Sequence, residues 1–517
     1  MCGFFAAKNV EMTFRLEETL DKRLGFRGPD YQSGLVSHAG WYLYHARLKI
    51  ISDTTESNQP YYSGDGAVLL FNGEILNFES LQQTYFGGVS SASDTIVLAR
   101  LLEIDDFDLD ELEGFFAFVR IDQNGQLTNA ARDAFGVKPL HYFNDGTKQI
   151  FSSEASAISD VLGLKYNKGA MEEYKVFRYP IFSESYFDNI RQVVPGTCLC
   201  RGQYFDAHGE MLSAEKAGPK DTFADVEKIV AESVRQRLIA DFPVAVLFSG
   251  GIDSNLVRAF VPSSTKFLTG GLVEPSFDTK FANSEIEQGL DVEILQVDDA
   301  KFLERWTQMV ALRKEPLSVP NEVIISFLGE RWATLGGKIL LSGEGADEFF
   351  GGYDRIFSWA GGIEFLDARE FLKRYAYVAL EDIPEWIIEA TNSYFAGVSN
   401  LSPFNMVRLF FVQKHMPVLF RRLDFSLMFS GIEGREPLAS KALFRAAIQF
   451  DYHACMADGL GKIPLREVAQ RLYSEEFAFR EKVGFPIDVK KIVTGEEAKN
   501  PKDIYSHWIN RNLELLA

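Results

Sequence analysis

The chain has 517 residues, of which 46% are hydrophobic and 24% charged, and its formal net charge is -20. This length predicts two or three domains, and the composition is that of a globular protein. A strongly acidic chain lacks the basic surface that nucleic acids require, and no run of about 18 uncharged apolar residues predicts a membrane helix. We therefore expect neither nucleic acid nor a membrane as a partner.

The four cysteines lie at positions 2, 198, 200 and 455, without the paired spacing of a disulfide scaffold. The N-terminus lacks the basic segment and the long apolar core of a signal peptide. Both observations favour a reducing compartment, and we expect a cytoplasmic location.

The first part of the sequence predicts a mostly β domain. Short apolar runs at residues 67–71 and 115–119 are bounded by turn signals such as Asn-Gly and Asp-Gln-Asn-Gly. The segment 206–221 is polar and rich in turn residues, so we interpret it as a linker. This division places one domain at residues 2–205 and another at residues 222–517.

The second domain alternates predicted strands and helices. Apolar runs predict buried strands at residues 244–248, 266–269, 292–297 and 338–341. A helical pattern surrounds residues 323–335, and the sequence is helical again from about residue 356. Such alternation predicts a parallel sheet with helices on both faces, whose ligands bind at the carboxyl ends of the strands.

The first candidate for chemistry is Cys2. Removal of Met1 would leave a cysteine with a free α-amine, whose reference pKa is near ~8, so that one residue would supply both nucleophile and base. By itself, a cysteine at position 2 is more simply a chance occurrence.

Seven further motifs follow Cys2 in order. They are Arg-Gly-Pro-Asp at 27–30, His-Ala-Arg-Leu at 45–48, Phe-Asn-Gly-Glu-Ile-Leu-Asn at 71–77, Ser-Asp at 93–94, Gly-Phe-Phe-Ala-Phe at 114–118, Arg-Asp-Ala-Phe-Gly-Val-Lys-Pro-Leu at 132–140 and Ser-Glu at 153–154. Together they resemble the glutaminase domain of class II amidotransferases, the N-terminal-nucleophile group. The resemblance spans nearly all of the first 200 residues.

This resemblance implies that Cys2 attacks the side-chain amide of glutamine. The negative oxygen that forms needs preorganised donors, which the family takes from an Asn side chain and a Gly backbone N–H, here Asn72 and Gly73. The alternative for Asn72-Gly73 is an ordinary hairpin turn.

The resemblance also implies a binding site for free glutamine. Its carboxylate would pair with the planar fork of Arg47, and its ammonium with Glu74 and Asp94. The remaining residues that the resemblance assigns to this site are Leu48, Ile50 and Ile51. For Asp94 alone, a carboxylate that caps a helix is the alternative.

A glycine-rich loop, Ser-Gly-Gly-Ile-Asp-Ser at residues 249–254, follows one predicted strand and opens a helix. Its glycines let the backbone approach an anion, and the helix N-terminus and two hydroxyls supply donors for phosphate oxygens. The lysine of a Walker loop is absent. The loop resembles that of enzymes that split ATP between its α and β phosphates; a bare Gly-Gly turn is the alternative.

An acidic loop, Leu-Ser-Gly-Glu-Gly-Ala-Asp-Glu-Phe-Phe-Gly-Gly-Tyr at residues 341–353, follows another predicted strand. Carboxylates beside a triphosphate require a divalent cation between them, so Asp253 and Asp347 are candidate Mg²⁺ ligands. Lys462 and Arg466 lie four residues apart and could neutralise phosphate charge. A solvated acidic turn and a solvated basic face are the alternatives.

The order of the three motifs resembles that of the glutamine-hydrolysing asparagine synthetase family, over essentially the whole chain. The resemblance implies an α+β N-terminal-nucleophile glutaminase domain with stacked antiparallel sheets. An α/β parallel-sheet ATP-pyrophosphatase domain of the adenine nucleotide α-hydrolase type would follow it. The substrates would be glutamine, ATP and aspartate, with Mg²⁺. The aspartate side chain would form an acyl-adenylate, and ammonia would displace AMP to give asparagine.

The family pattern carries over to particular residues of the second domain. Those expected to bind ATP are Leu247, Ser249, Gly250, Gly251, Asp253, Ser254, Gly270, Ser342 and Gly343. Glu344 would assist the acyl-adenylate step, and Lys462 would act on the phosphates.

The sequence departs from the family pattern where the acceptor binds. A Glu is replaced by Thr279, a His by Val292, and the last Asp of Arg-x-Pro-Phe-Leu-Asp by Ser440. Another carboxylate, such as a sugar acid of a surface polysaccharide or a natural-product acid, is therefore the alternative acceptor. A binding protein without activity conflicts with the intact motifs, and ring-closing relatives generally lack the N-terminal cysteine. The sequence leaves a homodimer open.

Overall fold

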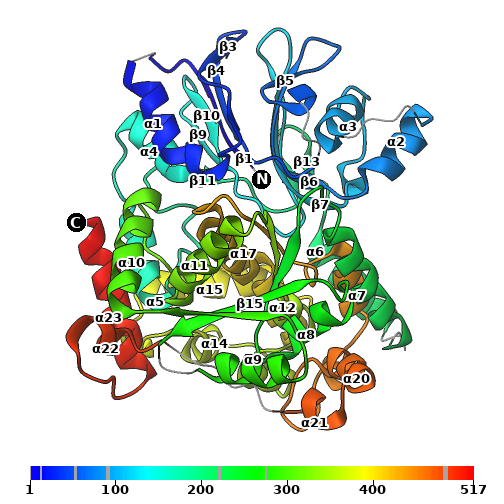
Figure 1. Cartoon of the computed structure of the whole chain (residues 1–517), viewed down its shortest axis with the longest axis vertical. Coiled ribbons are helices and arrows are strands. Elements are labelled where there is room, and N and C mark those ends of the chain that lie inside the picture. The colour runs from blue at the N-terminus through cyan, green and yellow to red at the C-terminus, as the bar shows by residue number, and fades with distance from the viewer. Residues whose placement is uncertain are drawn as a thin grey trace.

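The computed structural model describes residues 2–11, 14–51, 55–88, 93–218, 223–273, 276–480 and 487–517. We use the name N-terminal domain for residues 2–205 and the name C-terminal domain for the residues from 223 on. Figure 1 shows the antiparallel strands of the N-terminal domain above the parallel sheet of the C-terminal domain. None of the helices in the described parts of the chain has the length and apolar character that a membrane crossing requires.

Two antiparallel sheets form the N-terminal domain. The first has the order β11-β9-β10-β1-β4-β2, with β3 also on β4, and the second has the order β13-β12-β8-β7-β6-β5. The strands are β1 (Cys2–Lys8), β2 (Tyr31–Gln32), β3 (Val36–His38), β4 (Trp41–Arg47), β5 (Tyr61–Tyr62), β6 (Val68–Ile75), β7 (Gly114–Ile121), β8 (Leu127–Arg132), β9 (His141–Asn144), β10 (Gln149–Ser152), β11 (Arg191–Gln192), β12 (Thr197–Cys198) and β13 (Gly202–Gln203). The helices are α1 (Phe14–Leu24), α2 (Phe78–Phe86), α3 (Asp94–Leu101), α4 (Ala155–Leu162) and α5 (Lys168–Phe177).

A parallel sheet with the order β16-β15-β14-β17-β18 forms the centre of the C-terminal domain. Its strands are β14 (Val244–Leu247), β15 (Lys266–Leu272), β16 (Val292–Val297), β17 (Ile339–Leu341) and β18 (Glu433–Arg435). The helices up to the acidic loop are α7 (Phe223–Arg237), α8 (Ile252–Ala259), α9 (Phe277–Glu287), α10 (Asp299–Arg313), α11 (Asn321–Thr334) and α12 (Ala346–Phe350).

The rest of the chain is mainly helical. It contains α13 (Asp354–Gly361), α14 (Ala368–Tyr375), α15 (Glu385–Gly397), α16 (Pro403–Phe410), a π-helical turn (Phe411–His415), α17 (Met416–Met428), α18 (Lys441–Ala447), α19 (Tyr452–Cys455), α20 (Ile463–Leu472), α21 (Glu475–Ala478), α22 (Val489–Thr494) and α23 (Pro501–Leu516). The fold class predicted from the sequence is confirmed: antiparallel sheets come first, and a parallel sheet with helices follows.

Two expectations about the elements are wrong. Residues 206–221 were expected to be a linker, but Ala207–Ala217 form helix α6, which buries Met211 and pairs Glu210 with Arg445 at 2.8 Å. Residues 219–222 of that segment lie outside the described residues. The strand β18 was expected to be helical; its Glu433-Gly434-Arg435 is not an apolar run, and the side chains of Glu433 and Arg435 pair with each other at 2.6 Å.

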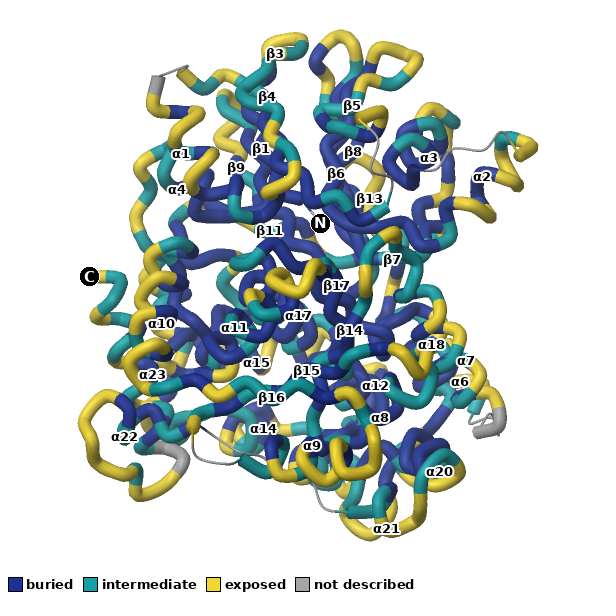
Figure 2. Tube along the Cα trace, viewed as in Figure 1, coloured by how far each residue is buried: buried dark blue, intermediate teal, exposed yellow. Residues whose placement is uncertain are grey.

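The two domains pack tightly against each other. Phe135 of the N-terminal domain lies with its ring centroid 5.2 Å from that of Phe349 and 5.6 Å from that of Phe444. Figure 2 shows that β1, β6 and β17 are buried near this junction. Apolar packing therefore holds the edge of the N-terminal sheets against the parallel sheet.

Glu436 follows β18 at the carboxyl edge of the parallel sheet. Its side chain is buried, and its Oε2 has no hydrogen-bond partner in the part of the chain that the structure describes. Burial raises the pKa of Glu436 to about 8, against the opposing effect of Lys138. The folded protein therefore holds a proton on Glu436 at neutral pH.

The buried Glu436 should make stability depend on pH. In the unfolded chain its pKa returns to the ordinary value of 4.5, so between that pH and about 8 the folded state binds more protons. Glu436 then lowers the free energy of unfolding as pH rises, by up to about 1.4 kcal/mol per pH unit. Glu436→Gln should remove this dependence, and urea unfolding between pH 5 and pH 8 measures it.

The exposed Glu389 supplies a matched control for that measurement. Glu389→Gln should leave the slope of unfolding free energy against pH as it is in the wild type. Equal slopes for the wild type and Glu436→Gln would contradict the assignment of a buried, protonated Glu436.

Candidate functional site

Cys2 begins strand β1 and lies opposite Arg47 of β4 in the sheet register. The main-chain nitrogen of Cys2 donates a hydrogen bond of 2.8 Å to Oδ1 of Asn72. Burial raises the pKa of the Cys2 thiol, while a hydrogen bond with the Leu48 backbone acts in the opposite direction. The main-chain nitrogen of Cys2 is thus held beside the Asn72 amide.

Asn72 and Gly73 occupy the middle of β6, beside β7. The Nδ2 of Asn72 is buried and has no hydrogen-bond partner among the described residues. Gly73 has φ +138, and a Cβ there would lie 2.0 Å from the Phe115 carbonyl oxygen, so only glycine fits. The amide therefore presents an unused donor next to the nucleophile, which is the arrangement that an oxyanion site requires.

Arg47, at the end of β4, is held by residues that the sequence analysis missed. Its Nη2 donates to Ser57 Oγ at 2.7 Å and its Nη1 to Asn58 Oδ1 at 2.7 Å. The Ile51 carbonyl accepts a longer bond of 3.5 Å from Nη2. These contacts fix the plane of the guanidinium; no sequence motif marked Ser57 or Asn58.

The two acids expected to bind an ammonium lie close together. Asp94 Oδ2 accepts a bond of 3.1 Å from the Ile75 N–H, while Glu74 Oε2 lacks a partner within the described residues. Burial, the larger cause, and the negative charge of Asp94, the second cause, raise the pKa of Glu74 well above its ordinary value. Two buried acids of this kind are stabilised by a cationic group between them. Ile50 is buried, and its carbonyl accepts from the Asp241 N–H of the C-terminal domain at 3.1 Å.

The glycine-rich loop connects β14 to α8, at the carboxyl edge of the parallel sheet. Ser254 Oγ lies 3.0 Å from Ser249 Oγ and donates to the Ser249 carbonyl at 2.9 Å. The Gly250 N–H donates to Asp278 Oδ1 at 2.9 Å. Asp278 thus occupies one of the donors that an anion would use.

A cavity of about 1120 Å³ lies at this edge. Most of the predicted nucleotide residues line it, namely Leu247, Ser249, Gly251, Asp253, Ser254, Gly270, Ser342 and Gly343, together with Glu344 and Asp347. Gly250 and Lys462 are outside this lining, although each contacts a residue that belongs to it. The structure therefore gathers the two loops, far apart in sequence, around one space.

Lys462 joins the two candidate metal ligands. Its Nζ lies 2.8 Å from Asp253 Oδ2 and 2.9 Å from Asp347 Oδ1. Lys462 precedes α20 with φ +61, a backbone conformation that is uncommon for a residue other than glycine. Arg466, expected on the same face, instead donates to the carbonyl oxygens of Gly461 and Ala478.

Three acids of the acidic loop were marked by the sequence, and Tyr353 lies in the same motif, but the partner Arg422 was missed. Arg422 of α17 lies 3.6 Å from Glu344, and the Tyr353 hydroxyl donates to Glu348 at 2.5 Å. Burial raises the pKa of Glu344 to about 7, which Arg422 opposes, and burial raises that of Glu348 to about 8. Both acids are therefore poised to change protonation near neutral pH.

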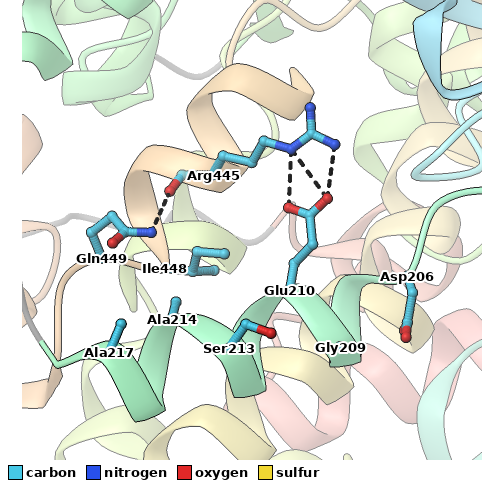
Figure 3. Close-up of a pocket in the computed structure, with 9 residues that line it drawn as sticks. All are labelled: Asp206, Gly209, Glu210, Ser213, Ala214, Ala217, Arg445, Ile448 and Gln449. Carbon is cyan, nitrogen blue, oxygen red and sulfur yellow. Dashed lines mark hydrogen bonds and ion pairs between the residues drawn. The ribbon is translucent and has the colours of Figure 1, made fainter.

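A second hollow, of about 720 Å³, lies between α6 and α18 (Figure 3). Arg445 points across it to Glu210, as the close-up shows, and its other ion pair is with Asp110. None of the predicted site residues lines this hollow. Arg445 and Glu210 in this hollow pair with each other, so the cavity at the sheet edge, which gathers the predicted residues, is the better candidate for chemistry.

Two known sequence families match different parts of the chain. The sequence model described as asparagine synthase matches residues 225–516, and the one described as glutamine amidotransferase domain matches residues 1–208. The chain is 24% identical to the glutamine-hydrolyzing asparagine synthetase 1 of Bacillus subtilis, over 96% of this chain and 88% of that protein. It is 30% identical to the amidase chry2 of Gibberella zeae, over 66% of this chain and 55% of that protein. The glutamine-hydrolyzing asparagine synthetase of Asparagus officinalis is 29% identical, over 68% of this chain and 60% of that protein.

Proposed function

The chain belongs to the asparagine synthase family, and from this premise we propose that it is an ATP-dependent carbon–nitrogen ligase that takes ammonia from glutamine and makes asparagine from aspartate. The other products would be glutamate, AMP and pyrophosphate, and we place the enzyme in the cytoplasm. The observation that carries the proposal is the convergence of the phosphate loop, the acidic loop and Lys462 on one cavity, in the same chain as the Cys2–Asn72 pair.

The N-terminal domain would hydrolyse glutamine. After removal of Met1, the α-amine of Cys2 takes the proton of its own thiol, and the thiolate attacks the glutamine amide. The unused Nδ2 of Asn72 and the Gly73 N–H stabilise the negative oxygen. The amine then returns its proton to the departing nitrogen, which leaves as ammonia, and the acyl group stays on Cys2 as a thioester. Water attacks the thioester, which releases glutamate and restores the Cys2 thiol.

Recognition of free glutamine uses charges at both ends of the amino acid. Arg47, held flat by Ser57 and Asn58, binds the carboxylate as a planar fork. Glu74 and Asp94 bind the ammonium, whose positive charge relieves the cost of two buried acids. The glutamine site would also be lined by the residues that follow Arg47, namely Leu48, Ile50 and Ile51.

The C-terminal domain would bind ATP through the residues that line the cavity. The hydroxyls of Ser249 and Ser254 and the amides at the start of α8 face phosphate oxygens, while Leu247 and Gly270 lie against the adenosine. Gly250 is freed for phosphate when its N–H leaves Asp278. Ser342 and Gly343 form the opposite wall.

The residues present fit a magnesium ion. Asp253 and Asp347 approach a single Lys462 nitrogen within 2.9 Å, so they lie close enough to share one cation. One or two carboxylates together with substrate phosphates are a usual set of ligands for Mg²⁺. Bound there, Mg²⁺ supplies neutralising charge to the phosphates. Lys462 neutralises the same carboxylates before the nucleotide binds.

The amide bond would form in two steps. A carboxylate of the acceptor attacks the α phosphate, giving the acyl-adenylate and pyrophosphate. Ammonia then attacks the acyl carbon, and Glu344, whose pKa is about 7, takes the proton that the nitrogen loses as AMP leaves.

Two charged groups near the acidic loop favour aspartate. Arg422 lies in the cavity beside Glu344 and suits an α-carboxylate, and Glu348 keeps an oxygen without a partner within the described residues, which suits an ammonium. An amino acid with a second carboxyl would satisfy both.

A different carboxylic acid is the second candidate. Thr279 and Ser440 stand where the family has acids, and here both lie at the start of a helix. The Thr279 N–H donates to Ser276 Oγ, and Ser440 Oγ accepts from the Leu443 N–H, both at 3.2 Å. Two relatives at 29% and 30% identity are named amidases rather than asparagine synthetases.

Cys2→Ala should separate the two activities. Glutamine-dependent AMP formation should fall by on the order of a thousandfold, because the substitution removes the thiol that attacks the glutamine amide. AMP formation with ammonium salts should persist, since the C-terminal domain does not need the thiol. Cys200→Ala changes an exposed thiol and should leave both activities intact; equal loss of both in Cys2→Ala would refute the role of Cys2.

The acceptor can be identified by AMP release with ATP, Mg²⁺, saturating ammonium and a panel of acids. Aspartate should exceed succinate, which lacks the ammonium that Glu348 would bind. Arg422→Gln should lower kcat/KM for aspartate by about tenfold or more, the effect of one lost charge-assisted hydrogen bond. Turnover with another acid and none with aspartate would reject aspartate and favour the second candidate.

A further inference from the structure

A group of buried ionic side chains lies between the two domains. We call it the interdomain ion cluster. Its members are Arg27, Lys138 and Glu154 from the N-terminal domain and Arg313, Glu315, Glu322, Arg421 and Asp424 from the C-terminal domain. All of them are buried. Ionic groups removed from water in this way are retained only when each has partners, so their positions are tightly set.

Arg27 connects the cluster to the nucleophile. It ends a short 3-10 helix (Gly25–Arg27) that follows α1. Its Nε donates to the main-chain carbonyl of Cys2 at 3.1 Å, and its Nη1 donates to Glu154 at 2.7 Å. The Arg27 guanidinium therefore holds the main chain at Cys2, the residue that carries the thiol.

The other side of the Arg27 fork is held by the C-terminal domain. Asp424 of α17 accepts from Nη1 at 2.8 Å and from Nη2 at 3.2 Å, a two-point contact that fixes the plane of the guanidinium. Burial would raise the pKa of Asp424, but Arg27 and Lys138 outweigh it and keep the pKa below its ordinary value. The contact between the domains therefore favours the ionised form of Asp424.

Helix α17 reaches both sites from neighbouring positions. Arg421 pairs with Glu154 at 2.5 Å on the side of Cys2, while Arg422 lies 3.6 Å from Glu344 in the cavity. Since a helix is rigid over one turn, the place of Asp424 is set by the packing of the C-terminal domain.

We propose that Asp424 is a positioning residue of the glutaminase site: it orients Arg27, which holds the Cys2 main chain, so the C-terminal domain supplies part of the machinery for glutamine hydrolysis. The inference rests on the proposed role of Cys2. Asp424 does not touch glutamine; it acts through Arg27. Loss of the Asp424 charge would allow Arg27, and with it the Cys2 main chain, to shift. A small displacement of a nucleophile can lower the reaction rate strongly.

The test measures kcat and KM for glutamine hydrolysis without ATP, and AMP formation with ammonium, in the full-length chain. Asp424→Asn should lower kcat for hydrolysis by about tenfold or more. KM should stay within about twofold, because Arg47, Glu74 and Asp94 keep their contacts. AMP formation with ammonium should also be retained, which reports an intact C-terminal domain.

Glu315→Gln is the matched control. Glu315 is a buried acid of the same cluster that pairs with Arg313 and Arg421 and makes no ion pair with Arg27 within the described ranges. It should leave kcat for hydrolysis near the wild-type value. An equal loss in both variants would overturn the proposal, because the effect would then be general to the cluster.

Asp424→Glu keeps the charge and covers the case in which Asp424→Asn loses both activities. Its longer side chain shifts the carboxylate that holds Arg27, so kcat for hydrolysis should fall by less than in Asp424→Asn while AMP formation persists. A wild-type kcat in Asp424→Asn, or an equal loss of both activities in Asp424→Glu, would overturn the inference alone. A wild-type protein without glutamine hydrolysis would overturn the proposed function and this inference together.

Discussion

Strand β1 is hydrogen-bonded along its length to β4, and its second half also to β10. This pairing fixes the position of Cys2. It sets Cys2 opposite Arg47, beside Asn72 of β6, at the buried junction of the domains. A glycine is then required at position 73, because β6 and β7 approach too closely there for a side chain. The proposed oxyanion donor Asn72, the proposed glutamine-binding residue Arg47 and the Arg27 contact all depend on the position of this strand.

The second site depends on the order of the parallel sheet. Because β14, β17 and β18 are neighbours, the loops that follow them open at one edge. The chain is strongly acidic, and many carboxylates line the cavity. Two cations at or beside the cavity are placed against particular acids: Lys462 between Asp253 and Asp347, and Arg422 beside Glu344. Such a cavity suits a nucleotide that arrives with its own divalent ion.

Local signals allowed much of the fold to be predicted. The runs at 244–248 and 338–341, each followed by a glycine-rich loop, correspond to β14 and β17. The strand β18 was missed because its Glu433–Arg435 pair is buried without being apolar. Helix α6 was missed because its polar sequence resembles a linker, and its few buried contacts come from elements distant in the chain.

For the same reason, the sequence marked the residues within motifs but not those that hold them. Ser57 and Asn58 support Arg47. Asp424 supports Arg27 across a sequence separation of 397 residues. No periodicity or spacing records such contacts, since they form only in the folded chain, and the Arg27–Asp424 contact only when the domains dock.

The central claim is that one chain releases ammonia at Cys2 and consumes it at the ATP cavity. The most direct measurement supplies glutamine whose side-chain amide carries heavy nitrogen, together with ATP, Mg²⁺, the acceptor acid and excess unlabelled ammonium. Mass spectrometry then reads the isotope of the new amide. An amide that carries mostly the heavy label is expected if the ammonia released at Cys2 reaches the cavity of the C-terminal domain before it mixes with the bulk ammonium. An amide with only the isotope of the bulk ammonium would contradict the central claim.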